Sequence, residues 1–384
     1  MSFQVKNILF LDHMSKPSGG EIYLLSVLKE VDKDKFNIKV VLGQNGFLHE
    51  RLLEEKIDVE VIKLPKELIE RRKEQYKRSA FMDLKHYYSY ARVLCKYIKE
   101  NKIDIVYTNS IKSDIYGSLA AKMSGVPCVW FMHDRLSAEY FSKGLARLIA
   151  LFSRLFAKKV ICNSESTKRS FVRAGGQKDK AVVVLNGIDV DKYTIHHNTS
   201  HSKRVVMVGR IAPWKGQKIF IEAARKILEH RDDVNFYIAG SVLFGEDTYR
   251  DEIETIIEDK YKISNRMYIC DFVEDIPEFL QEADILVHAS IIPEPFGLSV
   301  AEGMASGLAV IAAQAGGIVE MIKDNENGFL YAPGNSSQLA DKITCLLDDK
   351  ELAKRLGENA RRTIEEDFNI KDKVKEIEDV LSRL

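Results

Sequence analysis

The two glutamates that flank one short loop, Glu294 and Glu302, are the residues of this sequence whose type and spacing point most directly to chemistry. The loop holds two prolines and a glycine, and it leads from a short apolar run into a helix of small residues. The first N–H groups of a helix have no partner within it and lie at its positive end, where phosphate binds readily. A carboxylate can accept hydrogen bonds from two neighbouring hydroxyls, so the arrangement predicts a nucleotide-sugar site. The N–H groups concerned belong to Phe296, Gly297, Leu298 and Ser299.

Two signals indicate how the backbone holds this loop. The short run at residues 285–288 is typical of a buried strand, and Gly307 is a stop signal at the end of the helix. Taken alone, two glutamates at this spacing more often belong to a surface loop and to a helix with one buried acid. The surrounding prolines, phenylalanine and glycines favour the functional interpretation.

A second pair of charged residues, Arg210 and Lys215, opens the second half of the chain. They follow a predicted strand at residues 204–208 and precede a helix that begins near Gln217. Cations at the mouth of a strand-to-helix loop can both reach one diphosphate. Each charge-assisted hydrogen bond of this kind contributes roughly 1.5–3 kcal/mol.

In both places the sequence resembles a known family. The order Glu, seven residues, Glu, with Phe-Gly just after the first Glu, and the order Gly-Arg, four residues, Lys-Gly are similar to motifs of the retaining glycosyltransferases of family four, the group 1 glycosyltransferases. The resemblance covers essentially the whole chain. It implies the GT-B fold, an α/β fold in which two doubly wound Rossmann-like domains face a central cleft. It also implies sugar transfer from a UDP- or GDP-linked donor to a glycan, a lipid-linked or another acceptor in cell-surface polysaccharide or glycolipid synthesis.

The resemblance further implies a role for each site residue. Arg210 and Lys215 would neutralise the diphosphate in place of a divalent ion, so neither a metal nor a cofactor is expected. Glu302 would hold the ribose hydroxyls and Glu294 the hydroxyls of the transferred sugar, while backbone groups near Val273 would bind the nucleobase. No residue is an obvious covalent nucleophile, which fits the family's same-face displacement, in which the departing phosphate helps to deprotonate the acceptor.

Polar residues also follow two predicted strands of the first half. Asn109 comes directly after the strand at 103–108, and His133 directly after the strand at 128–132. The carboxyl ends of parallel strands meet at one edge of a sheet, so both side chains point to one site. A lone His beside an Asp is more often structural, but members of the resembled family place a His here, near the transferred sugar. We therefore expect Asn109 and His133 to bind the acceptor, and His133 to take part in catalysis.

A glycine pair, Gly19 and Gly20, follows the first predicted strand at residues 7–11. Such glycines suit a phosphate-binding turn at the carboxyl edge of a parallel sheet, and a plain turn is the alternative. The resembled family often has Gly-Gly-Ala-Glu here, near the donor diphosphate and the acceptor, whereas this chain has Ser-Gly-Gly-Glu. Both glycines are assigned to the donor site.

Charge and strand spacing indicate the domain organisation. The 384 residues carry no net charge, but residues 1–200 hold 34 Lys and Arg against 23 Asp and Glu, and residues 201–384 hold 23 against 34. Strand-like runs alternate with helical patterns in both halves, which predicts doubly wound parallel sheets. We expect an acceptor-binding domain at 1–195, completed by a helix at 368–384, and a nucleotide-sugar-binding domain at 196–367. The other predicted strands are 38–42, 59–62, 160–162, 235–239, 267–269 and 309–312.

Several absences bear on the compartment and on metals. The five cysteines show no metal-ligand spacing, and those in or beside apolar runs are expected to be buried and reduced, as in a cytoplasmic protein. No apolar run approaches the length of a membrane-spanning helix, and the N-terminus shows no signal-peptide pattern. Asp189 and Asp191 match the Asp-x-Asp metal motif of another glycosyltransferase fold, but their turn context favours a coincidence.

Two stretches are rich in basic residues. Residues 63–85 hold eight Lys and Arg, and residues 140–159 combine five with an apolar pattern at helical spacing. The second stretch predicts either a helix that lies on anionic lipid, peripheral on the inner face of the plasma membrane, or a helix that packs on the core. Neither stretch interleaves aromatic and basic residues, so no nucleic-acid partner is expected.

Other functions fit the same fold or the same site. An epimerase or a phosphorylase could use this fold, and a phosphorylase would need a lysine that forms a Schiff base with pyridoxal phosphate. A non-catalytic scaffold could bind sugar nucleotides without turning them over, although it would not need the full set of Arg210, Lys215, Glu294 and Glu302.

Overall fold

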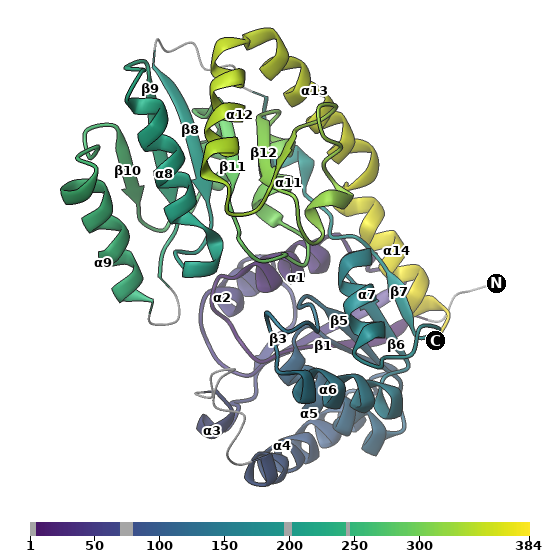
Figure 1. Ribbon diagram of the computed structural model, residues 1–384. Coiled ribbons are helices and arrows are strands. Elements are labelled where there is room, and N and C mark those ends of the chain that lie inside the picture. Colours follow the sequence, from purple (N-terminus) through teal and green to yellow (C-terminus); the bar gives the residue numbers. More distant parts are fainter. Residues whose placement is uncertain (1–4, 70–79, 196–201, 243–245) are drawn as a thin grey trace. The chain divides into compact units, whose positions relative to one another are not determined.

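The computed structural model describes residues 5–69, 80–195, 202–242 and 246–384. It forms two compact units (Figure 1). Unit 1 runs to Gly187 and resumes at Ile370–Leu384, and unit 2 is Ile188–Asn369. Each unit contains one sheet, and all its paired strands are parallel. The predicted α/β architecture, with a doubly wound sheet in each half, is confirmed.

The sheet of unit 1 has the strand order β3-β2-β1-β4-β5-β6-β7. The order reverses between β1 (Lys6–Asp12) and β4 (Ile105–Thr108). Ligands of open parallel sheets bind outside the carboxyl ends of the strands at such a switch point. Asn109 directly follows β4 there, and the loop after β1 leads to Gly19. The other strands are β2 (Phe36–Leu42), β3 (Val59–Val61), β5 (Cys128–Met132), β6 (Lys159–Cys162) and β7 (Ala181–Val183).

The sheet of unit 2 repeats this plan with the order β10-β9-β8-β11-β12-β13. Its switch point lies between β8 (Lys203–Val208) and β11 (Ile285–His288). Arg210 and Lys215 follow β8, and Glu294 follows β11, so the topology brings their loops to one edge. The other strands are β9 (Val234–Ala239), β10 (Met267–Cys270), β12 (Ala309–Ala313) and β13 (Phe329–Tyr331).

Helices connect the strands of both units. In unit 1 they are α1 (Gly19–Glu30), α2 (Phe47–Glu54), α3 (Lys66–Ile69), α4 (Ala80–Glu100), α5 (Ile111–Ser124), α6 (Lys143–Phe156), α7 (Glu165–Arg173) and α14 (Ile370–Ser382). In unit 2 they are α8 (Gln217–Leu228), α9 (Asp247–Thr255), α10 (Ile276–Gln281), α11 (Leu298–Ala305), α12 (Ser336–Asp348) and α13 (Lys350–Asp367). Shorter helical turns of unit 2 are η2 (Val190–Lys192), η3 (Pro213–Lys215), η4 (Ile256–Lys260) and η5 (Ile318–Glu320).

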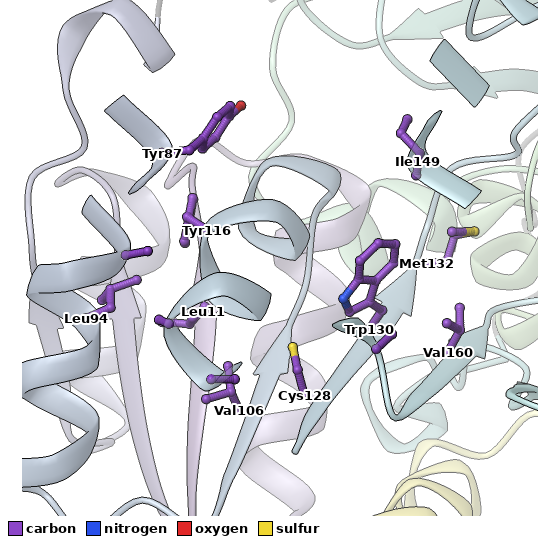
Figure 2. Close-up of a cluster of buried hydrophobic side chains, with 14 of the residues drawn as sticks. Leu11, Tyr87, Leu94, Val106, Tyr116, Cys128, Trp130, Met132, Ile149 and Val160 are labelled. Atoms are coloured by element: carbon purple, nitrogen blue, oxygen red, sulfur yellow. The ribbon is translucent and has the colours of Figure 1, made fainter. Parts of the chain in front are cut away.

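The sheet of unit 1 is buried on both faces, which explains its continuous apolar strands. In β1, Leu9 and Leu11 belong to the core on one face, and Ile8 and Phe10 to the core on the other. Figure 2 shows the first of these cores, in which Trp130 lies among side chains of the sheet and its covering helices. Helix α14 packs into the second core, together with residues of α1 and α2.

The division between the units differs from the predicted boundary at residues 195 and 196. Unit 2 already begins at Ile188, because the segment after it is bonded to the rest of unit 2. Ile188 N donates to Phe368 O at 2.7 Å, and Arg361 Nη1 donates to Tyr193 O at 2.7 Å. Most of the polar stretch that suggested the later boundary, at 196–203, lies outside the described residues, as does part of the basic stretch at 63–85.

Two strands and one cysteine differ from the sequence-based expectation. The strands β7 and β13, each three residues long, were not predicted. Strand β3 is equally short but lies within the predicted run at residues 59–62, so length alone does not explain the difference. Cys270 is half-buried rather than buried, since it ends β10 at the edge of the sheet of unit 2. Cys128 and Cys162 are buried, as expected.

Two glycines of unit 2 with similar backbone angles differ in how closely they are packed, and this difference tests the packing of the loop at the switch point. Gly216 has a φ of +80°, and a Cβ there would lie 1.9 Å from Ala289 O at the end of β11. Gly334 has a similar φ of +81° but open space around it. We expect Gly334→Ala to lower the free energy of unfolding by about 1–2 kcal/mol through backbone strain alone. Gly216→Ala should cost about 2 kcal/mol more, because the loop must move.

Urea unfolding followed by Trp214 fluorescence, in a Trp130→Phe background, measures this difference in unit 2. Equal destabilisation by the two substitutions would contradict the close approach of the loop to β11.

Candidate active site

Glu294 is the centre of a hydrogen-bond cluster at the carboxyl end of β11. Three donors meet at one carboxylate oxygen, Oε1: Lys215 Nζ at 2.8 Å, His288 Nε2 at 2.8 Å and the Ser290 hydroxyl. Lys215 comes from the loop after β8, so its ion pair with Glu294 joins the loops on the two sides of the switch point.

The cluster keeps Glu294 ionised although the residue is only 8% exposed. Burial alone would raise its pKa, but the charges and hydrogen bonds of Lys215 and His288 outweigh burial and hold the pKa of Glu294 well below its usual range. The second carboxylate oxygen, Oε2, makes no hydrogen bond within the described residues. One oxygen is therefore fixed by the protein, and the other can accept a hydrogen bond from a ligand hydroxyl.

The main chain of Glu294 is held by the glycine pair Gly316 and Gly317. Gly317 N donates to Glu294 O at 2.8 Å. A Cβ at Gly316, whose φ is +72°, would lie 2.0 Å from the same carbonyl oxygen. Only glycine allows this approach, so the loop after β12 fixes the backbone from which the Glu294 carboxylate projects.

The two predicted cations share an aromatic neighbour. Arg210 Cζ lies 5.2 Å and Lys215 Nζ lies 4.7 Å from the centre of the Trp214 ring. Arg210 Nη2 also lies 3.8 Å from Glu246 Oε1. The structure thus brings Arg210, Lys215 and Glu294 into one cluster of unit 2, and their functional roles stay a prediction.

Helix α11 begins directly after Gly297, which has a φ of +101°. The N–H groups of its first residues, Leu298 and Ser299, have no i−4 carbonyl partner and lie at the positive end of the helix. The Phe296 ring is buried, with its centroid 6.1 Å from that of Phe368. Phe296 can therefore meet a ligand only through its backbone.

Glu302 lies in the second turn of α11, where its Oε1 accepts from the Tyr193 hydroxyl at 3.4 Å. Burial raises the pKa of Glu302 to about 7, and the hydrogen bond from Tyr193 opposes burial only in part. The carboxyl group is consequently close to half-ionised at neutral pH. A ligand hydroxyl that donates to it would favour the ionised form.

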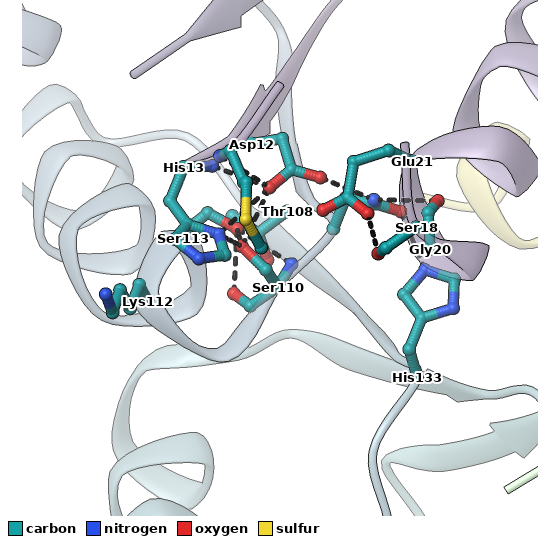
Figure 3. Close-up of polar contacts among 12 residues, drawn as sticks. Asp12, His13, Ser18, Gly20, Glu21, Thr108, Ser110, Lys112, Ser113 and His133 are labelled. Atoms are coloured by element: carbon teal, nitrogen blue, oxygen red, sulfur yellow. Dashed lines mark hydrogen bonds and ion pairs between the residues drawn. The ribbon is translucent and has the colours of Figure 1, made fainter. Parts of the chain in front are cut away.

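Like unit 2, unit 1 has a buried carboxylate at its switch point, that of Asp12 (Figure 3). Its Oδ1 accepts from His13 N at 2.6 Å and from the Ser110 hydroxyl at 3.1 Å, and its Oδ2 accepts from Asn109 Nδ2 at 2.6 Å. Burial alone would raise the pKa, but the interactions with His13, and then those with Asn109 and Met14 N–H, hold the pKa of Asp12 below its usual value.

Asn109 connects Asp12 to His133. Its Nδ2 also donates to Gly20 O at 3.2 Å, and its Oδ1 lies 2.8 Å from His133 Nε2. A Cβ at Gly20 would lie 3.5 Å from the imidazole, so the first turn of α1 contacts His133. Burial lowers the pKa of His133 to about 4, despite the opposing charges of Asp12 and Asp134, so the imidazole is neutral at pH 7.

The structure adds polar residues that the sequence analysis did not select. Most of them end or closely follow a predicted strand, and this position at the carboxyl edge is a signal that could have found them. Tyr193 had no such signal, because its contact with Glu302 spans 109 positions of the chain. Of the predicted residues not yet placed, Gly19 is the first residue of α1, and Val273 is half-buried in the loop after β10. The added residues are Asp12, His13, Ser110, Tyr193, His288 and Ser290.

Two features are absent from the described part of the chain, a cluster of metal-ligating side chains and a membrane-spanning helix. No group of three or more His, Cys, Asp or Glu side chains there could hold a metal ion. Asp189 of the Asp-x-Asp match pairs with Lys192, Oδ2 to Nζ, at 3.2 Å. Of the helices described, none is long and apolar enough to cross a bilayer.

Comparison with known families covers nearly the whole chain. Residues 17–192 match Glycosyltransferase Family 4, and residues 192–363 match Glycosyl transferases group 1. The chain belongs to the group 1 glycosyltransferases. The family predicted from the Glu-x7-Glu and Gly-Arg-x4-Lys-Gly motifs is thereby confirmed.

Two curated relatives of this glycosyltransferase are similar over about three quarters of their length. One is the UDP-Gal:alpha-D-GlcNAc-diphosphoundecaprenol alpha-1,3-galactosyltransferase of Escherichia coli, 28% identical over 75% of this chain and 77% of that protein. The other is the N,N'-diacetylbacillosaminyl-diphospho-undecaprenol alpha-1,3-N-acetylgalactosaminyltransferase of Campylobacter jejuni, 28% identical over 76% of this chain and 79% of that protein.

Solved structures identify the fold of this glycosyltransferase. The crystal structure of HepE from Anabaena in complex with UDP-glucose has a TM-score of 0.85 and 29% identity, covering 98% of this chain and 100% of that one. TarM, with a TM-score of 0.77 and 15% identity over 99% of both chains, shares the fold. The two doubly wound units are those of the GT-B fold.

The raised pKa of Glu302 predicts how stability depends on pH. The protonated form is favoured in the folded protein up to about pH 7, whereas an unfolded glutamate ionises near 4.5. The unfolded chain releases this proton first, so the contribution of Glu302 to the free energy of unfolding falls as pH rises from about 4.5 to 7. Glu302→Gln should therefore stabilise the protein by roughly 2 kcal/mol at pH 8 and have little effect near pH 4.5.

Urea unfolding of the wild-type protein and the variant at both pH values measures this difference. Glu60→Gln, in β3 of unit 1, is the control for the loss of an exposed carboxylate. A Glu302→Gln effect that is the same at both pH values would contradict the raised pKa.

Proposed function

We propose that this glycosyltransferase transfers a sugar from a UDP-linked donor, bound by unit 2, to a lipid-linked acceptor, with retention of the anomeric configuration. The observation that carries the proposal is the Glu294 carboxylate. Three donors hold its Oε1, and its Oε2 is unengaged within the described residues. A fixed, ionised acceptor beside the Lys215 ammonium is suited to a sugar hydroxyl next to a diphosphate.

The donor is supported by relatives and by the charges of unit 2. HepE was solved with UDP-glucose, and the Escherichia coli relative is named for UDP-Gal. Arg210 and Lys215 would stabilise the charge that develops on the leaving diphosphate, with help from the first N–H groups of α11. Glu302 would hold the ribose hydroxyls. With two cations assigned to the diphosphate, we propose that the transfer needs no divalent metal.

Retention without a covalent intermediate is supported by the state of the carboxylates at the two switch points. Glu294 has a lowered pKa and three donors on one oxygen, which makes it a weak nucleophile. Asp12 is fully buried, and both its oxygens accept hydrogen bonds. We therefore favour a same-face displacement, in which the departing phosphate accepts the proton of the acceptor hydroxyl.

The acceptor is supported by the names of the relatives. Both the Escherichia coli and the Campylobacter jejuni proteins are named for acceptors linked to diphospho-undecaprenol. We assign the acceptor to unit 1, with His133 at its switch point, in the synthesis of a cell-surface polysaccharide or glycolipid. Such an acceptor requires the enzyme to work at a membrane surface.

The assignment of the cations predicts a loss of turnover. Arg210→Ala and Lys215→Ala should each lower kcat/KM for the donor by about 10- to 100-fold, because each removes a charge-assisted bond to the diphosphate. The assay follows UDP release from a panel of UDP-sugars, with a short-chain polyprenyl-diphosphate sugar as acceptor and with EDTA present. NMR of the product gives its anomeric configuration. Lys218→Ala, which removes an exposed α8 lysine paired with Glu252, is the control and should keep full activity.

Each alternative has its own outcome in this assay. Unchanged turnover in both variants, complete loss of activity with EDTA or an inverted product would contradict the mechanism. Isomerisation of the donor sugar without acceptor would indicate an epimerase. Donor binding without turnover on any acceptor would indicate a scaffold.

We also propose that α6 lies on an anionic membrane surface. The helix divides its side chains between two surroundings: Ala146, Ile149 and Ala150 are buried, whereas its outer leucines are exposed. Residues 141–164 include five Lys and Arg and no Asp or Glu. An exposed apolar stripe flanked only by cations suits anionic lipid, and the sequence-based alternative of a core helix accounts for the other face. The exposed leucines are Leu148 at 59%, Leu151 at 51% and Leu155 at 66%.

Vesicle binding tests this surface. Replacing the three exposed leucines of α6 together by Ser should weaken binding to phosphatidylglycerol vesicles by about tenfold or more, since each leucine loses its buried apolar area. Arg147→Ala with Arg154→Ala should weaken binding to these vesicles at low salt but not to neutral ones. Leu53→Ser, at a leucine of α2 that is 54% exposed, is the control. If the α6 variants bind like this control, α6 is not the docking surface.

A further inference from the structure

The orientation of the Asn109 side chain is fixed by its two acceptors. Asn109 is 3% exposed, and its Nδ2 lies 2.6 Å from Asp12 Oδ2 and 3.2 Å from Gly20 O. A carboxylate and a carbonyl oxygen only accept hydrogen bonds, so the NH₂ group must face them. If the amide were turned over, its oxygen would face two acceptors and both buried bonds would be lost.

Asp12 can impose this orientation because it stays ionised. His13 N–H, the Ser110 hydroxyl and Met14 N–H donate to its Oδ1 at 2.6, 3.1 and 3.3 Å. These donors would be left unpaired if the carboxyl group were protonated and rotated. Asp12 therefore remains an acceptor, and the direction of its bond with Asn109 does not change.

The fixed amide determines which nitrogen of His133 carries the proton. Asn109 Oδ1 accepts, so His133 Nε2, 2.8 Å away, must donate to it. Burial keeps the imidazole neutral at pH 7, with a pKa lowered to about 4. A neutral ring has only one N–H, and Nδ1 is left with a lone pair. Nδ1 makes no hydrogen bond within the described residues, and His133 is half-buried rather than fully buried.

We propose that Asp12 and Asn109 are positioning residues that fix His133 in its Nε2–H tautomer, so that Nδ1 accepts a hydrogen bond from a substrate hydroxyl. This deepens the proposed function and rests on it for the identity of the hydroxyl, which belongs to the acceptor. It also changes the role predicted for Asn109. Both polar groups of that side chain are engaged within unit 1, so Asn109 acts on a ligand through His133 rather than by contact.

The tautomer can be measured without any substrate. In protein labelled with ¹⁵N-histidine, two-dimensional NMR distinguishes Nε2–H from Nδ1–H, and the His133→Gln variant identifies the His133 signals. We expect the Nε2–H form in the wild-type protein at pH 7.5. Asp12→Asn should give a mixture of tautomers, because an amide at position 12 can donate as well as accept and no longer fixes Asn109. Asn109→Ala, which removes the acceptor of the Nε2 proton, should do the same.

Asp134→Asn is the control for charge. Asp134 lies beside His133 in the chain, and its replacement changes the local charge. It does not change the hydrogen bonds that connect Asp12, Asn109 and His133, here called the relay, so the tautomer should stay Nε2–H. In the transfer assay, Asp12→Asn should lower kcat by about tenfold, as for the loss of one hydrogen bond, while KM for the donor stays within about twofold.

A wild-type His133 that is protonated on Nδ1, or an Nε2–H tautomer that persists in both relay variants, would overturn the inference. If Asp12→Asn does not fold, Asn109→Ala decides the question. If the wild-type protein turned over no sugar donor, the proposed function would fail, but the NMR result would still confirm or reject the relay.

Discussion

Each sheet of this glycosyltransferase depends on one buried, ionised carboxylate that bonds the loops on the two sides of its switch point. In unit 1, Asp12 is the last residue of β1 and accepts from Asn109, which follows β4. In unit 2, Glu294 follows β11 and accepts from Lys215, which follows β8. Backbone hydrogen bonds also join these segments, from Asn109 N to Leu11 O at 3.0 Å and from Ile291 N to Trp214 O at 3.0 Å, and the carboxylates add side-chain bonds at the edge where a ligand is expected. A buried carboxylate is tolerable only while its donors are in place, so the two clusters depend on these bonds.

The sequence allowed most of the fold to be predicted, because both sheets are covered on two faces and their strands are continuous apolar runs. The short strands β7 and β13 were missed, although β3, which is equally short, was predicted. The division between the units differs from the predicted boundary, because the segment around Tyr193 joins unit 2 through bonds to residues far along the chain.

The candidate site was predictable in its charged residues and not in its hydrogen bonds. Arg210, Lys215 and Glu294 were found from motifs that place a residue on a loop. The sequence could not show that Lys215 and Glu294 already neutralise each other, because 79 positions separate them. The roles of His288 and of Asn109 likewise depend on the hydrogen-bond partners of their side-chain atoms, and the order of residues in the chain does not give these partners.

Burial also keeps other carboxyl groups in an unusual state, among them Glu302 and Glu21. The pKa of Glu302 is raised to about 7 and that of Glu21, which accepts from the Ser18 hydroxyl, to about 8. Carboxyl groups whose pKa is raised toward neutral pH in this way lower the free energy of unfolding at a pH where they must ionise. Carboxyl groups with perturbed pKa values also gather at functional sites. Glu302 fits this pattern, because the hydrogen bond from Tyr193 opposes burial only in part and ribose hydroxyls would add further donors.

The position of α14 has a consequence for the order in which the molecule can form during translation. Ile370, Val374, Ile377 and Leu381 belong to the core of unit 1, yet the ribosome makes them after all of unit 2. Unit 2 is continuous in the chain and has every residue of its own core before α14 emerges. Unit 1, although its strands are synthesised first, must wait with one face of its sheet partly uncovered. The nascent chain would therefore be most vulnerable to aggregation at that face while unit 2 is being synthesised.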